Sequence, residues 1–314
     1  MSKNEESKLF HGMAILSASL LFCSFLSLDI SAAAAELEST AVVPAEPLDP
    51  PWPNIAIVAL NDSPCPYNNG AAFGGSGDTY IHGGIFTNGC LTGNGNNFDV
   101  IVDDGYIRYV GGFHGYNNFD PDPEQVNIPI TEIVDLEEVI QAECAKLPFY
   151  PPASYKQTTE QTILYPGNYL GPSFIDGNTE LIPGLYCVTE DITIDAGESV
   201  VGSDVTIFLQ GGNVTINGGA LLNLSAPKRE VGPLNIFRHL LFYVTQGDIT
   251  WGCGSGQYAE GRVYAPMGDI QVSGNFGYGA VTLNTQFVGW NVEVTGNSII
   301  DIMPYFLEDF VDSD

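Results

Sequence analysis

The feature that most constrains the fold is a short unit that recurs along the second half of the chain. In each copy a polar residue stands between two apolar residues, and the copies are Ile192-Thr193-Ile194, Val214-Thr215-Ile216, Ile249-Thr250-Trp251, Ile270-Gln271-Val272 and Val292-Glu293-Val294. Their centres are 22, 35, 21 and 22 residues apart. Short apolar runs alternate with these units, at 205–209, 221–224, 240–244, 263–265 and 281–283.

This periodicity predicts a mainly β fold, a short-coil β-helix (solenoid) with coils of roughly 20 residues. In each short strand the apolar flanks point inward and the central residue points to solvent, because side chains alternate along a strand. Gly and Asn accept the positive φ that the corners require. The 35-residue step indicates one coil with an insertion at 226–238. A Greek-key sandwich also uses short strands, but it predicts no fixed period.

One helix is expected beside the solenoid, in the segment TEIVDLEEVIQAECAKL at 131–147. Thr131 suits the N-cap, and Pro148 ends the segment. Helical spacing places four apolar residues on one face, and they are Ile133, Leu136, Ile140 and Leu147.

The charge balance excludes one large class of partners. Nine Lys and Arg stand against 38 Asp and Glu, so the formal net charge is −29. Nucleic acid is not expected as a partner, because phosphate binding needs clustered cations. The sequence also has no C-x-x-C pair to indicate a zinc site, and we expect no cofactor and no metal.

The N-terminus indicates export. Residues 9–28 form an apolar span without a formal charge, and Lys3 and Lys8 precede it. Residues 1–35 are therefore interpreted as a signal peptide or a membrane anchor, with both alternatives open. Residues 36–54 form a Pro-rich acidic linker, 55–303 the solenoid, and 304–314 an acidic tail. The body is expected outside the cytoplasm, at the cell surface or extracellular.

Five cysteines follow the apolar span. In an oxidising compartment we favour the pairs Cys65–Cys90 and Cys144–Cys187, with Cys253 free. The sequence cannot fix the connectivity, and the alternative is one bridge or none, with small buried thiols.

The second half resembles a known family. The run LIPGLYCVTEDITIDAGESVVGSDVTIFLQGGNVTINGGALLNLSAP, followed by LLFYV, GRVYAPMGDIQVSGN and FVGWNVEVTGNSIIDI, is similar to the exported C-terminal region of TadG-like proteins of the tight-adherence (Flp-type) pilus system. The resemblance extends over about 55–303. It implies an exported protein whose partners are envelope or pilus proteins.

A weaker resemblance is to ice-binding β-solenoids, which combine short coils with a flanking helix. Their surface requires a flat, regular row of outward Thr, whereas here the expected row is Thr193, Thr215, Thr250, Gln271 and Glu293. Two of the five positions interrupt the row.

The sequence also contains candidates for a catalytic site and a metal site. A polysaccharide-active β-helix needs two carboxylates across a groove, and the candidates are Asp99, Asp103 and Asp104 with His82 or His114. The sequence Asp103-Asp104-Gly105 is typical of a turn, and His114 is expected in a Gly-rich corner. The stretch DPDPE at 120–124 offers oxygen ligands for Ca²⁺ but equally suits an extended linker.

The sequence thus predicts a non-catalytic exported cell-surface protein that acts as an adhesion or pilus-assembly scaffold. Its partners would be envelope or pilus proteins or an external surface, and the membrane through 9–28 if that span is uncleaved. The alternatives are an ice-binding β-solenoid, a polysaccharide-active enzyme and a self-assembling filament subunit.

Overall fold

The structure is a computed structural model that describes residues 54–302, except 66–69, 96–97, 104, 116–118, 131–135, 152–161, 171–174, 176, 229–236, 275–280 and 297–299. The chain divides into two units, Met1–Val43 and Pro44–Asp314. All described residues belong to the second unit. The expected signal or anchor (1–35), nearly all of the linker (36–54) and the acidic tail (304–314) lie outside the described residues.

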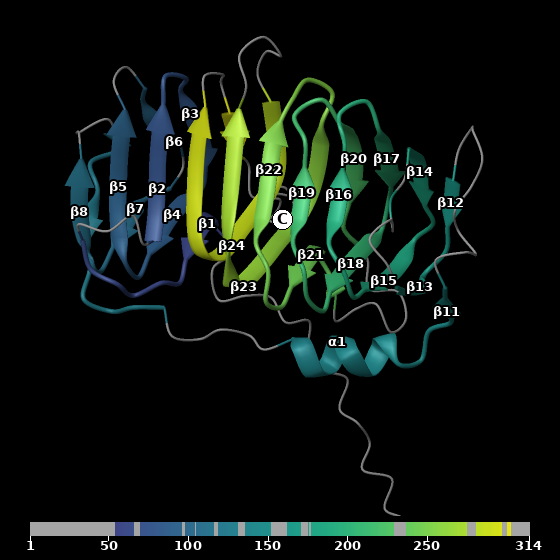
Figure 1. Cartoon of the computed structure of the whole chain (residues 1–314). Helices are drawn as coiled ribbons and strands as arrows, with labels where there is room; N and C mark the ends of the chain where they lie inside the picture. The colour runs from purple at the N-terminus through teal and green to yellow at the C-terminus, as the bar shows by residue number, and fades with distance from the viewer. Residues whose placement is uncertain are drawn as a thin grey trace, which may run out of the picture. The chain divides into compact units, whose positions relative to one another are not determined.

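The second unit is the predicted β-solenoid. Its described residues form 25 strands and one helix, α1 (Glu137–Cys144). Each strand pairs with its counterpart on the adjacent coil, so that the strands stack side by side (Figure 1). Every pairing among the described strands is parallel, which distinguishes the fold from an antiparallel Greek-key sandwich. The stacked strands make three faces.

The first is the helix-covered face, along which α1 lies. In stacking order it contains β11 (Phe149–Tyr150), β13 (Gly167–Tyr169), β15 (Gly184–Val188), β18 (Val205–Leu209), β21 (Leu240–Val244), the middle of β23 (Tyr258–Gly274), the middle of β24 (Val281–Gly296), β1 (Ile55–Ala59), β4 (Gly84–Thr87), β7 (Ile107–Tyr109) and β10 (Glu124–Gln125).

The second is the threonine face. In stacking order it contains β16 (Ile192–Ile194), β19 (Val214–Ile216), β22 (Ile249–Cys253), the last parts of β23 and β24, β2 (Gly70–Gly75), β5 (Cys90–Gly95) and β8 (Gly112–Gly115).

The third is the mixed face, whose outward side chains are apolar, polar and charged. It contains β12 (Thr162–Leu164), β14 (Asn178–Leu181), β17 (Ser199–Gly202), β20 (Leu221–Ser225), the first parts of β23 and β24, β25 (Ile300–Ile302), β3 (Thr79–His82), β6 (Val100–Asp103) and β9 (Phe119–Asp120).

The coils do not stack in chain order. Strands β1–β10 form the N-terminal coils, and the chain then runs back through α1 to begin the C-terminal coils at β11. The last C-terminal strands, β24 and β25, pair with the first N-terminal strands, β1, β2 and β3. In Figure 1 the blue N-terminal strands accordingly lie at one end and the teal strands that begin the C-terminal coils at the other, with yellow β24 between them beside β1.

The interior is one apolar column, as the sequence predicts. The residues expected to point inward are all buried in it, and they are Ile194, Val205, Ile207, Ile216, Val272 and Val294. Large aromatic rings lie in this column, where Trp251 packs edge-on against Phe242 and Phe287.

A second apolar layer lies between the helix-covered face and α1. Ile140 and Cys144 of the helix pack there against outward residues of the strands, including Phe208 and Tyr243. The helix is shorter than expected and has Leu136 at its N-cap position. The proposed cap Thr131 and Ile133 lie outside the described residues, whereas Leu136 and Ile140 are buried as expected.

This layer corrects one expectation. Thr206 alternates with inward Val205 and Ile207, so the pattern predicts a solvent-facing residue that would tolerate Asp. In the structure Thr206 is buried, and its hydroxyl donates a hydrogen bond to the Leu240 carbonyl at 2.8 Å. Alternation identified the side of the strand correctly, but the layer that covers that side excludes water.

Two disulfides are present, and they are the two pairs favoured from the sequence: Cys65–Cys90 and Cys144–Cys187. Cys253 is free and buried, and burial raises the pKa of its thiol to about 12. Two disulfides are typical of a protein that folds in an oxidising, extracellular compartment. Within the described part of the chain, no helix is long and apolar enough to span a membrane.

Candidate functional site

The threonine face presents a straight row of outward side chains. Register pairs each central residue with its counterpart on the next coil, in the order Thr193, Thr215, Thr250, Gln271, Glu293, Ala72, Thr92 and His114. The first five are exposed or half-buried. We call these five residues the open strip. Strands stack about 4.8 Å apart, so the open strip is about 19 Å long.

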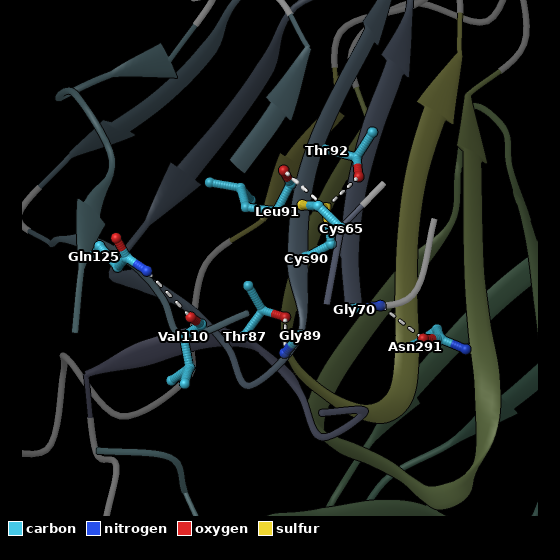
Figure 2. Close-up of a disulfide and its surroundings, with 10 residues drawn as sticks. All are labelled: Cys65, Gly70, Thr87, Gly89, Cys90, Leu91, Thr92, Val110, Gln125 and Asn291. Atoms are coloured by element: carbon cyan, nitrogen blue, oxygen red, sulfur yellow. Dashed lines mark hydrogen bonds between the residues drawn. A yellow bond between two sulfur atoms is a disulfide. The ribbon is translucent and has the colours of Figure 1, made fainter. Parts of the chain in front are cut away.

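The row continues beyond the open strip, where the first disulfide covers it. Ala72 and Thr92 are buried, and the Cys90 sulfur lies 3.4 Å from the Thr92 hydroxyl oxygen (Figure 2). On the next strand a Cβ at Gly112 would lie 3.2 Å from the Cys65 sulfur. The open strip therefore ends at Glu293, and of the three further residues in the row only His114 is exposed.

A ladder of Asp and Asn side chains fixes the coils along one edge of this face. Each ladder residue stands directly before an apolar–polar–apolar unit, and the five are Asp191, Asn213, Asp248, Asp269 and Asn291. A side-chain oxygen of each of the first three accepts the backbone N–H of the next, at 2.7, 2.9 and 2.8 Å. The Asp269 carboxylate then accepts a hydrogen bond from the side-chain amide of Asn291 at 2.7 Å. The side-chain oxygen of Asn291 accepts one from the Gly70 N–H at 2.7 Å.

The ladder holds the strands in register before any partner arrives. A rigid surface loses little conformational entropy on binding, so such a row is suited to recognition. Reasoning from the sequence missed these residues, although the sequence contains a signal for them: Asp or Asn immediately precedes every apolar–polar–apolar unit. It also missed Ala72 and Thr92, because Ala72 is not polar and Thr92 is followed by Gly93 instead of a larger apolar residue.

The surroundings of the open strip are acidic. Exposed Asp191, Asp195 and Asp248 border it, and Glu293 lies within it. The described lysines and arginines are Arg108, Lys146, Lys228, Arg238 and Arg262, and none lies in the strands or strand parts that form the threonine face. The strip therefore presents hydroxyl and amide groups inside a field of negative charge.

The catalytic candidates are divided between two faces. His82 and Asp103 are adjacent in register on the mixed face, whereas His114 lies on the threonine face. The described partner of His82 is Asp301, whose Oδ1 lies 3.0 Å from Nε2. Asp99 is exposed, and its backbone N–H donates to Asp78. Asp104 lies outside the described residues.

The calcium candidate at 120–124 is exposed. Glu124 forms an ion pair with Arg108 at 3.2 Å, and Arg108 also lies over the Tyr106 ring. The described residues contain no group of three or more His, Cys, Asp and Glu side chains placed to hold a metal ion.

The mixed face has a shallow hollow of about 300 Å³ beside β14, β17 and β20. Its lining includes Glu180, Val201, Asn223 and Ser225, with Glu180 as its carboxylate. Glycoside hydrolysis requires two carboxyl groups across a site, so this lining does not supply that pair.

The insertion at 226–238 is joined to the solenoid by charged groups. Lys228 forms an ion pair with buried Glu260 at 2.6 Å, and the Tyr258 hydroxyl donates to the same carboxylate. Nearby, buried His239 has a pKa lowered to about 3, first by burial and then by the positive charges of Arg238, Arg262 and Lys228. These groups lie apart from the open strip.

Comparison with solved structures finds a similarity at the level of the fold. No family model and no curated protein matches the chain. A solved structure, an ice binding protein from an Antarctic biological consortium, is 16% identical and has a TM-score of 0.29. The match covers 79% of this chain and 88% of that one. At this similarity the activity of that protein cannot be transferred to this chain.

Proposed function

We propose that the chain is a non-catalytic, exported cell-surface protein, an adhesion or pilus-assembly scaffold that binds its partner through the open strip. One observation carries this proposal: five outward side chains stand in register on a face that the helix does not cover. The TadG-like sequence pattern supports the same function, because it belongs to exported proteins of a pilus system.

The chemistry of the strip indicates the kind of partner. Hydroxyl and amide groups exchange hydrogen bonds with a polar surface, and the bordering carboxylates favour a partner with positive charge. A basic patch on an envelope or pilus protein meets both conditions, and so does an external surface that carries amines. Such electrostatic attraction would weaken as the salt concentration rises.

Paired substitutions test the proposal in the native host. Thr215→Lys with Thr250→Lys adds bulk and positive charge to the strip, and should abolish attachment or piliation. The matched control places the same two lysines on the mixed face, at exposed Asn223 and Thr282, and should leave both intact. Normal attachment and pili in the strip variant would show that the strip is not the binding surface. Release of oligosaccharides from a glycan by the purified protein would contradict the non-catalytic assignment.

Ice binding is the second candidate, and one observation favours it. Thr193, Thr215 and Thr250 are in register on three adjacent strands. Gln271 and Glu293 interrupt the row on the next two. Thermal hysteresis of the purified protein, lost in the Thr215→Lys and Thr250→Lys variant, would identify ice as the target. A scaffold would show no hysteresis in either form.

A further inference from the structure

The two sets of coils meet at a junction between distant parts of the chain. At this junction β1, β2 and β3 of the N-terminal coils pair with β24 and β25 of the C-terminal coils. We call this junction the seam. It joins residues that are very far apart in sequence: the Asn61 amide donates to the Asn291 side chain across 230 residues, at 3.0 Å.

Only noncovalent contacts of the described residues cross the seam. They include backbone hydrogen bonds from Leu60 to Gly289 and from Asn61 to Trp290, at 2.9 and 2.8 Å. Side chains add His82 with Asp301 at 3.0 Å and the bond from the Gly70 N–H to Asn291 (Figure 2). The Cys65–Cys90 bridge lies wholly within the N-terminal coils. The Cys144–Cys187 bridge ties α1 to the C-terminal coils.

The segment between β10 and β11, which connects the two sets of coils, is also divided between them. Its first part is held by the N-terminal coils, because Asn88 exchanges two hydrogen bonds with the backbone of Ile130, at 2.7 and 2.8 Å. Its second part, α1, lies beneath the C-terminal coils (Figure 1). Residues 131–135 join the two parts and can span at most about 20 Å.

We propose that the seam is exchangeable, so that the N-terminal coils of one copy can dock on the C-terminal coils of a second copy of this chain. Every seam contact then re-forms unchanged between copies, because the register and the partners are identical. The exchanged form differs from the monomer in which copy supplies each set of coils and in the contacts between the two solenoids. Such exchange of an identical element is a low-cost route to a dimer.

The order of synthesis supplies an opportunity for exchange. Strands β1–β3 are made first, and their edge stays unpaired until β24 and β25 have been made. An open edge of parallel strands pairs with any strand of matching register. A neighbouring copy presents the same β24 and β25, and competes with the chain's own strands, whose effective concentration is in the millimolar range for a short connection. This inference is independent of the open strip, and either can fail alone.

Single cysteines placed on the two sides of the seam test exchange directly. Tyr80 of β3 and Asp301 of β25 are paired in register, half-buried and outward. Two full chains with different tags, one with Tyr80→Cys and one with Asp301→Cys, are co-expressed and oxidised. Exchange predicts a covalent dimer with an 80–301 bridge between the tags, and twice the monomer mass in gel filtration with light scattering.

The control pair does not cross the seam. Tyr80 and Ile101 are also paired in register, and both belong to the N-terminal coils. Co-expressed Tyr80→Cys and Ile101→Cys chains should therefore give no bridge between tags. A second reporter pair, Ala72→Cys with Glu293→Cys, tests the seam on the threonine face in case Asp301→Cys unfolds the protein.

Two outcomes overturn the proposal. In the first, all chains stay monomeric and the 80–301 bridge is no more frequent than the 80–101 bridge. In the second, a dimer forms without the 80–301 and 72–293 bridges, which would mean that the copies associate through another surface.

Discussion

The carboxylate of Asp248 accepts a hydrogen bond from the backbone N–H of Asp269, 2.8 Å away on the adjacent coil. Asp248 also donates its own N–H to the Asn213 side chain at 2.9 Å. It therefore links three successive coils at the edge of the threonine face, where a one-residue slip would turn every side chain to the other side.

The ladder predicts a difference between two substitutions at this position. Asp248→Ala removes the acceptor of the Asp269 N–H and should lower the free energy of unfolding by about 1 kcal/mol. Asp248→Asn keeps an acceptor oxygen and should be nearly neutral. Urea unfolding of both purified variants measures this, and equal losses would show that the hydrogen bond does not stabilise the coil.

The glycines before the ladder residues are required by close stacking. A Cβ on Gly268 would lie 1.8 Å from the carbonyl oxygen of Gly247, on the adjacent coil. Gly268→Ala should therefore cost several kcal/mol, on the order of 3, through forced displacement of backbone. Gly211 has no neighbour within 4 Å of such a Cβ, and Gly211→Ala should change thermal stability little. If the two variants melt at the same temperature, the corner is less rigid than the stacking indicates.

The alternation within one unit gives a matched comparison. Ile194→Asn buries an amide in the apolar column and should destabilise by about 3 to 5 kcal/mol. The same change one residue earlier, Thr193→Asn, keeps a polar group in solvent and should cost less than about 0.5 kcal/mol. Denaturant titration decides, and comparable damage from both would contradict the register.

The local part of the fold could be predicted from the sequence because each coil repeats the same chemistry. The spacing of Thr193, Thr215 and Thr250 gave both the coil length and the outward row, and register confirms that they are neighbours. The inward residues followed from alternation alone. Cysteine position and compartment likewise led to the two disulfide pairs, with Cys253 left over.

Contacts between distant parts of the chain could not be predicted in the same way. Nothing in the pattern of β1 states that it pairs with β24, because a repetitive edge fits many strands equally well. Periodicity also cannot say what covers an outward side chain. Thr206 and Thr215 both stand between two apolar residues. Thr206 is buried by the layer beneath α1, whereas Thr215 lies on the threonine face and is half-exposed.

The Cys144–Cys187 bridge should stabilise the attachment of α1. It closes a loop of 43 residues, which corresponds to about 4 kcal/mol in the chain-entropy account. Replacing both cysteines with Ala should lower the unfolding free energy by that order and expose the apolar layer, so that the variant binds a hydrophobic dye. Removing Cys65 and Cys90 is the control, because that bridge lies away from α1 and should cause no dye binding. Dye binding by both variants would show that the layer opens for another reason.

Acid should destabilise the protein in part through His239. The unfolded chain binds a proton at this histidine with the ordinary pKa of 6.5, whereas in the folded state burial and nearby cations lower the pKa to about 3. Between these values the unfolded state holds more protons, so the contribution to stability is complete above pH 6.5 and is lost as the pH falls towards 3. His239→Asn removes the titrating group and suits the left-handed backbone at φ 64°. Urea unfolding from pH 7 to pH 4 should show a shallower loss of stability for this variant, by up to about 1.4 kcal/mol per pH unit. Parallel curves for the variant and the original protein would mean that the histidine is protonated in the folded state.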